Sequence, residues 1–401
     1  MTTRRPSIAA IAALVLVGGS ACGSTGPPRV QPGTTAPPAS PTASEPTAGP
    51  PTCVQVVFDR LTLQQRVGQL FVLGLPNDTL GPAELEAIRA HHIGSVSFTA
   101  TTAEGVGGVH TVAAALQADA TQAATGGVRF FFAANQEGGE IQALRGSGFS
   151  TMPSAVQQGT FPPAALQHDA ARWGRELAAA GVNLDFAPVM DVVPAGTESQ
   201  NQPIGVLHRQ YGHDPATVGS HGSAFIRGME QAGIATTAKH FPGLGRVTGN
   251  TDVVAGVVDT VTSADDPSLR SFRDAIDAGV PFVMVALATY TRIDPSHLAV
   301  FSPAVMRLLR QGMGFDGVIA SDDMGAATAV ADVPPAERAI DFLSAGGDVI
   351  VSKGAGPTVA MADAVVARAS SDPGFSAVVA EAVVRILSAK DVAGLLPCSG
   401  D

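Results

Sequence analysis

Cysteine, paired histidines and basic stretches are scarce in this 401-residue chain, and each scarcity excludes a class of protein. The three cysteines are too few for a disulfide-built scaffold, and their spacing fits no zinc site. None of the nine histidines forms an HxxxH pair. The net charge is −11 with no basic stretch to offset it, which argues against nucleic-acid binding. We therefore expect no metal, no cofactor and no nucleic-acid partner.

Apolar residues are plentiful by contrast. They make up 45% of the sequence, and the mean hydropathy is +0.22, so the chain can bury a sizeable core. This composition excludes the fibrous, knottin, zinc-finger and multi-span membrane classes. It leaves a globular protein with one large domain or two ordinary ones.

The first 22 residues have the pattern of a bacterial signal peptide. Arg4 and Arg5 form a positive start, and an apolar run of about ten residues follows, too short to cross a hydrocarbon core ~30 Å thick. Small residues then lead to Cys22, a pattern that resembles the lipobox of lipoproteins. We expect a lipid anchor on Cys22 as the only membrane contact, and an extracytoplasmic protein at the cell membrane.

Residues 23–52 have the composition of a spacer. Pro, Gly, Ser, Thr and Ala supply 26 of these 30 positions, nine of them proline. Such a stretch cannot bury apolar surface, and its prolines keep it extended. We expect a disordered linker between the membrane and a domain that starts at Cys53.

From residue 53 onward, eight short apolar runs alternate with segments of helical period. The runs cover 67–75, 93–99, 129–135, 182–191, 234–240, 281–288, 317–322 and 348–352, and the clearest helical segments are 82–91, 164–180, 215–233, 267–279 and 303–314. Strands apolar on both faces that alternate with helices indicate parallel β-structure. Eight such units favour an α/β fold, a single-domain (β/α)8 TIM barrel over 53–401, rather than a doubly wound sheet.

Polar residues gather where four of these strands end. They are Asn135 to Gly139 after the third strand, Asp191 and then Arg209 after the fourth, Lys239 to Gly245 after the fifth, and Ser321 to Met324 after the seventh. A TIM barrel carries its chemistry at the carboxyl ends of its strands. The clustering therefore predicts an active site.

Four of these stretches resemble a known family. AKHFPGLG, GVIASDDM, NQEGG and NLDFAPVMDV are similar to the glycoside hydrolase family 3 β-N-acetylglucosaminidases of the NagZ type, and GRVTGNTD resembles its actinobacterial lipoprotein branch. The resemblance covers about residues 55–390. It implies a one-domain barrel, a retaining two-step mechanism and a GlcNAc-containing muropeptide or amino-sugar substrate.

The first aspartate of the SDD motif is the family's nucleophile, which implies this role for Asp322. A carboxylate at the tip of a strand is held rigidly, and retaining hydrolysis needs one to attack the anomeric carbon. The alternative is that an aspartate here caps the following helix. That alternative fits Asp323 at least as well as Asp322.

The resemblance implies substrate binding by Lys239, His240 and Arg209. We assign Asp191, at the end of the fourth strand, to the same group. A lysine at a buried strand end needs an acceptor or a counter-charge, which a polar ligand supplies. The alternative for Lys239 is an ion pair with Asp191 alone.

Two positions depart from the family pattern. Asn135 stands where the family has an aspartate that binds hydroxyls of the terminal sugar. The amide of Asn135 can still form hydrogen bonds to the substrate, but these bonds lack the negative charge of a carboxylate. Asn250-Thr251-Asp252 replaces an Asp-Ser/Thr-His run whose histidine is the acid/base.

We predict that Asp252 takes over the acid/base role, carried over the site by the glycine-rich loop 243–249 when substrate binds. Histidine titrates near 6.5 and would suit the task better. The alternative is that Asp252 caps the loop or pairs with Arg246.

Three functions remain open. The first is a retaining exo-β-N-acetylglucosaminidase that removes terminal GlcNAc from muropeptides in cell-wall turnover and recycling. The second is a catalytically inactive sugar-binding lipoprotein. The third is a phosphate-binding barrel enzyme, suggested by Gly354-Ala355-Gly356 after the last strand. We expect a monomer, because the sequence has no heptads or large apolar stripe.

With Cys22 acylated, Cys53 and Cys398 remain, near the two ends of the domain. The ends of a closed barrel chain lie near each other, and an extracytoplasmic location permits disulfides. We predict a Cys53–Cys398 disulfide. The alternative is two free thiols.

Overall fold

Eight parallel strands form the central sheet of this computed structural model, which describes residues 23, 26, 28 and 51–398. In spatial order they are β12 (Val318–Ser321), β9 (Phe282–Val285), β7 (Ala235–Phe241), β6 (Leu184–Asp185), β3 (Phe131–Ala134), β2 (Ser95–Phe98), β1 (Phe71–Leu75) and β13 (Ile350–Lys353). Ala320 of β12 also bridges to Val349 beside β13, so the sheet returns to its first strand. The predicted barrel is confirmed, and each of its eight strands overlaps one of the eight predicted runs.

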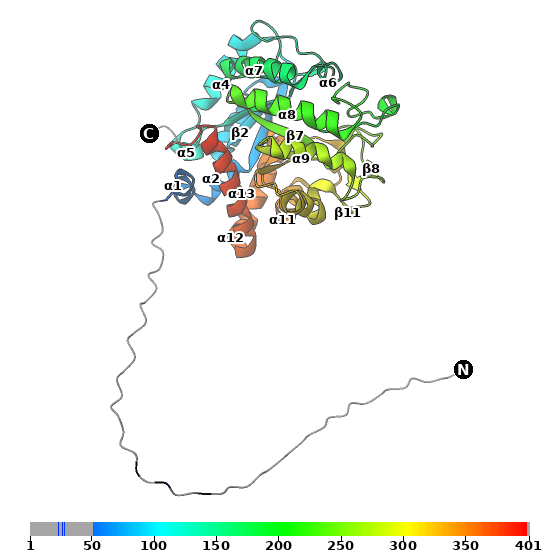
Figure 1. Cartoon of the computed structure of the whole chain (residues 1–401). Coiled ribbons are helices and arrows are strands. Elements are labelled where there is room, and N and C mark those ends of the chain that lie inside the picture. Colours follow the sequence, from blue (N-terminus) through cyan, green and yellow to red (C-terminus); the bar gives the residue numbers. More distant parts are fainter. Residues whose placement is uncertain (1–22, 24–25, 27, 29–50, 399–401) are drawn as a thin grey trace, which may run out of the picture. The chain divides into compact units, whose positions relative to one another are not determined.

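Helices connect the strands and surround the barrel (Figure 1). They are α1 (Cys53–Arg60), α2 (Leu63–Gln69), α3 (Pro82–Ala90), α4 (Gly105–Gln117), α5 (Gln122–Thr125), α6 (Ala155–Gln158), α7 (Pro163–Ala179), α8 (Pro215–Gln231), α9 (Arg270–Asp277), α10 (Pro303–Arg307), α11 (Pro335–Ala345), α12 (Ala355–Ser371) and α13 (Pro373–Val392). Short turns of 3-10 helix are η1 (Pro76–Asp78), η2 (Glu198–Gln200), η3 (Pro267–Leu269), η4 (Ala299–Phe301) and η6 (Thr328–Val330), and η5 (Leu308–Gly312) is a π-turn. Small strands lie in the loops: β4 (Gln136–Gly138), β5 (Ile141–Gln142), β8 (Val258–Asp259), β10 (Thr289–Tyr290) and β11 (Asp294–Leu298).

Local sequence explains where these helices begin. Helix α8 starts at Pro215, directly after Asp214, whose Oδ1 accepts the backbone N–H groups of Ala216 and Thr217 at 3.0 and 2.9 Å. An aspartate cap followed by proline satisfies the open end of a helix and fixes its first backbone angle. The helix predicted over 267–279 starts instead with the turn η3, and the one predicted over 303–314 ends in the π-turn η5.

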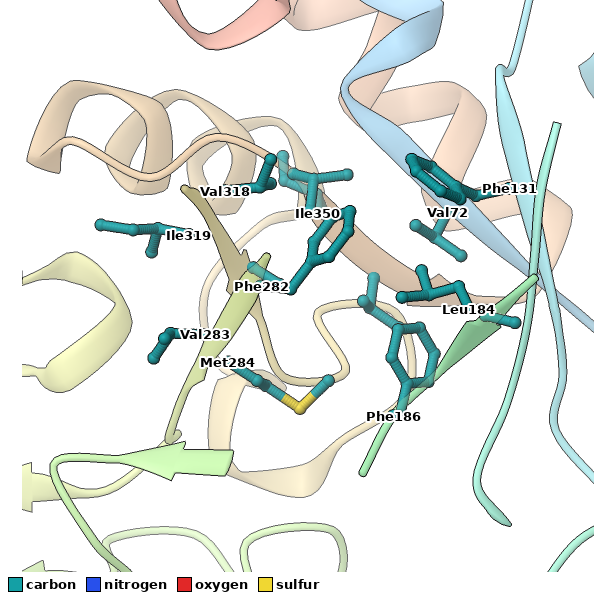
Figure 2. Close-up of a cluster of buried hydrophobic side chains, with 14 of the residues drawn as sticks. Val72, Phe131, Leu184, Phe186, Phe282, Val283, Met284, Val318, Ile319 and Ile350 are labelled. Atoms are coloured by element: carbon teal, nitrogen blue, oxygen red, sulfur yellow. The ribbon is translucent and has the colours of Figure 1, made fainter. Parts of the chain in front are cut away.

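Side chains from the strands fill the barrel (Figure 2). Phe131 on β3 and Phe282 on β9 are not on neighbouring strands, yet their ring centroids lie 5.4 Å apart with an edge-to-face geometry. Val72, Leu184 and Ile350 are buried in the same cluster. The barrel interior is therefore a packed core, and a site can form only at its ends.

Two strand predictions were too long. The apolar run 67–75 contains the end of α2, because Thr62 and Gln65 form a reciprocal capping box that starts a helix at Leu63. The run 182–191 forms only the two-residue strand β6. Pro188 follows β6 and has no backbone N–H to donate to a sheet.

The predicted disulfide joins Cys53 at the start of α1 to Cys398 after α13, with a Cα–Cα distance of 5.9 Å. It ties together two ends of the domain that are 345 residues apart in sequence. The predicted signal peptide, the lipid site Cys22 and most of the spacer lie outside the described residues. Within residues 51–398, no helix has the length and hydropathy needed to span a membrane.

Candidate active site

A cavity of about 290 Å³ opens at the carboxyl ends of the barrel strands. Asn135 after β3, Lys239 and His240 of β7, and Asp322 after β12 all line it. Its wall also contains Arg209, Asp252, Asp323 and Lys353. The structure therefore brings together the predicted site residues, from Asn135 to Asp322 in the sequence, with the exception of Asp191.

A buried carboxylate organises one wall of this cavity. Glu137 in β4 is 4% exposed and accepts two hydrogen bonds from Arg209, each 2.8 Å long. The ammonium of Lys239 lies 2.6 Å from Glu137 Oε1 and donates a 2.7 Å bond to Asn135 Oδ1. Burial alone would raise the pKa of Glu137, but the charges and hydrogen bonds of Arg209 and Lys239 outweigh it and hold that pKa at about 2. Glu137 is therefore ionised and fixes both cations at the cavity wall.

His240 stands beside this group and is oriented by Asp191. Its Nδ1 donates a 2.7 Å bond to Asp191 Oδ2, while Asp191 Oδ1 accepts the backbone N–H of Leu244 at 2.7 Å. Because a carboxylate can only accept, Nδ1 carries the proton, and Nε2 lies 3.5 Å from a guanidinium nitrogen of Arg209.

The assignment of Asp191 to direct substrate binding was wrong. Asp191 is 0% exposed and is absent from the cavity wall, because His240 and Leu244 take up its oxygens. The alternative in which Lys239 pairs only with Asp191 was wrong too. Lys239 pairs with Glu137 and Asn135.

The two aspartates of the SDD motif have different surroundings. Asp323 is buried, and its Oδ1 accepts the backbone N–H groups of Gly325, Ala326 and Lys353 at 2.9, 3.3 and 2.9 Å. Asp322 is partly exposed, and its Oδ1 accepts only the N–H of Asp323 at 2.8 Å. Asp323 is thus the structural carboxylate, while Asp322 presents a second oxygen that no described residue contacts.

Asp252 is exposed at the cavity wall. Among the described residues, none forms a hydrogen bond or ion pair with its carboxylate. The predicted alternative of a pair with Arg246 was wrong, because Arg246 lies 2.6 Å from Asp266 instead. The backbone carbonyl of Asp252 accepts the N–H of Thr328 at 3.0 Å, which attaches the end of this loop to the connection after β12.

The start of the same loop is held at several points. The Tyr290 hydroxyl donates to the carbonyl of Gly243 at 2.9 Å, and the Asn201 amide donates to those of Leu244 and Val247 at 2.7 Å. A Cβ on Gly245 would meet the Val192 carbonyl oxygen at 2.0 Å, so only glycine allows this close packing. Residues 243–247 are therefore fixed and cannot act as a hinge. A movement of Asp252 must come from the residues after Val247.

Sequence reasoning missed Glu137, although its motif was noticed. The signal that could have found it is charge. Lys239 was expected at a buried strand end and Arg209 in the loop after the fourth strand, and two cations that meet in one buried site require a carboxylate between them. Within NQEGG, Glu137 is the one residue that carries that charge.

A second buried carboxylate, Asp185 at the end of β6, lies behind this wall. Its Oδ1 accepts the backbone N–H of Gln136 at 2.9 Å, whereas its Oδ2 is buried without a partner among the described residues. Burial is the dominant effect and raises the pKa of Asp185 to about 7. Asp185 supports the strand end that presents Asn135 and Glu137.

Nothing in the described residues indicates a metal centre, because no group of three or more His, Cys, Asp and Glu side chains is placed to hold an ion. The glycine run after β13 has a structural use. Gly354, with a φ of 88°, directly precedes helix α12, and the run itself does not line the cavity.

Comparisons with known proteins point to one family. The model of the glycosyl hydrolase family 3 N terminal domain matches residues 62–389. A beta-hexosaminidase of Vibrio cholerae is 36% identical over 220 residues, which cover 54% of this chain and 64% of that protein. The match thus spans just under two thirds of that relative's length.

Solved structures share the fold over most of the chain. A beta-N-acetylhexosaminidase from Beutenbergia cavernae superposes with a TM-score of 0.81 and 49% identity, covering 82% of this chain and 98% of its own. LpqI of M tuberculosis superposes with a TM-score of 0.71 and 28% identity, covering 82% and 94%.

The raised pKa of Asp185 predicts a pH-dependent stability difference. Between about pH 4 and 7 the folded protein holds this proton and the unfolded chain has released it. The free energy of unfolding therefore falls as the pH rises through this window. Asp185→Asn cannot titrate and keeps the oxygen that accepts from Gln136. Relative to wild type, the variant should gain about 1 to 3 kcal/mol between pH 5 and pH 8.

Thermal or denaturant unfolding of both proteins across this range measures the difference. Two parallel stability curves would show that Asp185 does not take up a proton on folding.

Proposed function

The chain belongs to glycosyl hydrolase family 3, and on that premise we propose that it is a retaining exo-β-N-acetylglucosaminidase. Its substrates are muropeptides, from which it removes the terminal GlcNAc during cell-wall turnover and recycling. The names of the similar proteins from Vibrio cholerae and Beutenbergia cavernae, a beta-hexosaminidase and a beta-N-acetylhexosaminidase, support the sugar class.

One observation carries the proposal: one wall of the cavity holds hydrogen-bond donors, here called the donor wall, and a carboxylate with a free oxygen faces the same cavity. Arg209 and Lys239 supply the donors, Nε2 of His240 supplies an acceptor beside them, and Asp322 supplies the carboxylate. A sugar held through its hydroxyls on the donor wall presents its anomeric carbon to Asp322. Positioning of this kind removes a large part of the entropic barrier to attack.

In the first step, the free oxygen of Asp322 attacks the anomeric carbon and the bond to the aglycone oxygen breaks. Asp252 gives its proton to that oxygen, so the aglycone leaves as an alcohol. The sugar is now bonded to Asp322. This covalent intermediate has the opposite configuration to the substrate.

In the second step, a water molecule attacks the same carbon. Asp252 takes the proton of that water, the bond to Asp322 breaks, and the original configuration is restored. The unpartnered carboxylate of Asp252 at the cavity wall supports this assignment.

The second candidate, a sugar-binding protein without turnover, draws support from two residues. Asn135 and Asp252 stand where the family has an aspartate and a histidine. The two functions differ in one measurement, the release of product from a chromogenic N-acetylglucosaminide. Binding of muropeptides without any release would favour the binding protein.

We also propose that the chain is anchored outside the cytoplasm by a lipid on Cys22. The Cys53–Cys398 disulfide supports an oxidising compartment, since such bonds are rare in the cytosol. The signal sequence and the lipobox pattern support the anchor.

Replacement of the nucleophile gives the first prediction. Asp322→Asn should reduce kcat by at least about 10³-fold, because an amide cannot form the glycosyl ester. Its unfolding curve should stay close to that of wild type. In the wild-type enzyme, a fluorinated glycosyl donor should label Asp322, located by mass spectrometry of peptides. A label on Asp323 or Asp191 would overturn the assignment.

Replacement of the acid/base gives the second prediction. Asp252→Ala should lose about 10² to 10⁴ in kcat/KM on a substrate with a poor leaving group, and far less on a dinitrophenyl glycoside. Azide should restore turnover and yield a glycosyl azide, because the anion needs no base.

Asp265→Ala is the matched control for that variant. Asp265 is also exposed but does not line the cavity, so both substrates should be hydrolysed normally. Equal losses on the two substrates in Asp252→Ala, without azide rescue, would mean that another residue delivers the proton.

The anchor gives the third prediction. In a bacterium that processes lipoproteins, the full chain should partition with membranes and incorporate labelled fatty acid. Cys22→Ser should do neither and should enter the soluble extracytoplasmic fraction. A wild-type chain found in that soluble fraction would contradict the anchor.

A further inference from the structure

Lysine is used in only three places in this chain. Of its 24 basic residues, 21 are arginine, and the lysines are Lys239, Lys353 and Lys390. Lys239 is 2% exposed and Lys390 is 0% exposed. The side chain of Lys353 is 44% exposed, so it is the one lysine that reaches solvent, and it does so at the wall of the active-site cavity.

The other two lysines are buried, and their ammonium groups are bound by other residues of the protein. Lys239 is bound by Glu137 and Asn135. Lys390 donates to the side chain of Gln69 and to the carbonyls of Gly94 and Arg129 at 2.7 to 2.9 Å. Lys390 has no N–H left for a ligand, and the one that Lys239 keeps belongs to the donor wall that meets the sugar.

Lys353 is fixed at its backbone, and its ammonium makes only a long ion pair with Asp323. Its backbone N–H donates to Asp323 Oδ1 at 2.9 Å, which fixes the start of the side chain. The ammonium lies 3.6 Å from Asp323 Oδ2, beyond a good hydrogen bond. Among the described residues of the cavity wall, Arg209 and Lys239 both serve Glu137, which leaves Lys353 as the cation available to a bound anion.

The position of Lys353 around the barrel indicates which part of a substrate it meets. The donor wall of Arg209, Lys239 and His240 comes from the connection after β6 and from β7, which are neighbours in the sheet. Asp322 follows β12, and Lys353 ends β13, between β12 and β1. Lys353 is thus next to the nucleophile and on the far side of it from the donor wall.

A terminal pyranose has its outer hydroxyls and its anomeric carbon at opposite ends of the ring. With the hydroxyls on the donor wall and the anomeric carbon at Asp322, the aglycone extends toward β13 and β1. We infer that Lys353 determines aglycone specificity by binding a carboxylate on the group to which the terminal sugar is attached. This inference rests on the proposed hydrolase activity.

Two carboxylates in the proposed substrates have this chemistry. One is the lactyl group of a muramyl residue without peptide, and the other belongs to the stem peptide of a complete muropeptide. Three substrates with the same terminal sugar separate them: GlcNAc–GlcNAc, which is neutral, GlcNAc–MurNAc and GlcNAc–MurNAc-peptide.

The measurement is the ratio of kcat/KM between each anionic substrate and the neutral one. In wild type this ratio should exceed one and should fall as salt is added, since the contact is partly exposed. Lys353→Gln should lower the ratio about tenfold, mainly through KM, and Lys353→Arg should keep most of it. If Lys353→Gln lowers the ratio for only one of the two anionic substrates, that substrate carries the carboxylate that Lys353 binds.

Arg270→Gln is the matched control, because it removes an exposed positive charge that also lies 3.6 Å from an aspartate, on α9 and away from the cavity. It should leave the ratio unchanged. If Lys353 only balances the charge of Asp323, Lys353→Gln should lower the thermal stability and reduce turnover of all three substrates by one factor. That result would overturn the inference.

A second experiment does not depend on turnover. In the Asp322→Asn protein, an amine-reactive reagent should acylate Lys353 but neither of the buried lysines, Lys239 and Lys390. Peptide mass spectrometry locates the modified residue. GlcNAc–MurNAc should protect it more strongly than GlcNAc–GlcNAc. Equal protection would contradict the inference, whereas a lack of turnover by wild type on every substrate would contradict only the proposed activity.

Discussion

The Glu137 carboxylate holds two buried cations in place, and the sugar-facing wall of the cavity depends on it. It joins β4, the connection after β6 and β7 through Arg209 and Lys239. Either cation alone would be costly to bury, and the bidentate geometry of arginine suits a carboxylate well. The donors that meet a sugar therefore stand ready before any ligand arrives.

The opposite wall is built differently. Oδ1 of Asp323 accepts backbone N–H groups and so fixes the loop after β12, whereas no described residue donates a hydrogen bond to the carboxylate of Asp252 or to the second oxygen of Asp322. Lys353 takes its position from the same structural aspartate. A rigid wall of hydrogen-bonding groups thus shares the cavity with Asp322, Asp252 and Lys353, whose charged groups are accessible to a ligand. This arrangement suits attack on a sugar that the wall holds in place.

Much of the fold could be predicted, because strands buried on both faces are readable as apolar runs. The errors in strand length came from local signals within or beside the apolar runs, which the apolar pattern outweighed. The capping box at Thr62 converts part of one apolar run to helix, and Pro188 ends another strand early. In the site, the residues of the motifs were recognised from the sequence, but the residues with which they form hydrogen bonds and ion pairs were not. Asp191 acts through His240, and Glu137 became visible only when its two cations met in space.

The central claim is that Asp322 attacks the anomeric carbon and that water displaces it in a second step. The most direct measurement is the configuration of the sugar at the moment of release, followed by proton NMR faster than mutarotation. Two successive inversions predict that β-N-acetylglucosamine appears first from a β-linked muropeptide and the α-anomer only later. The α-anomer as the first product would mean a single displacement by water and would contradict a covalent role for Asp322.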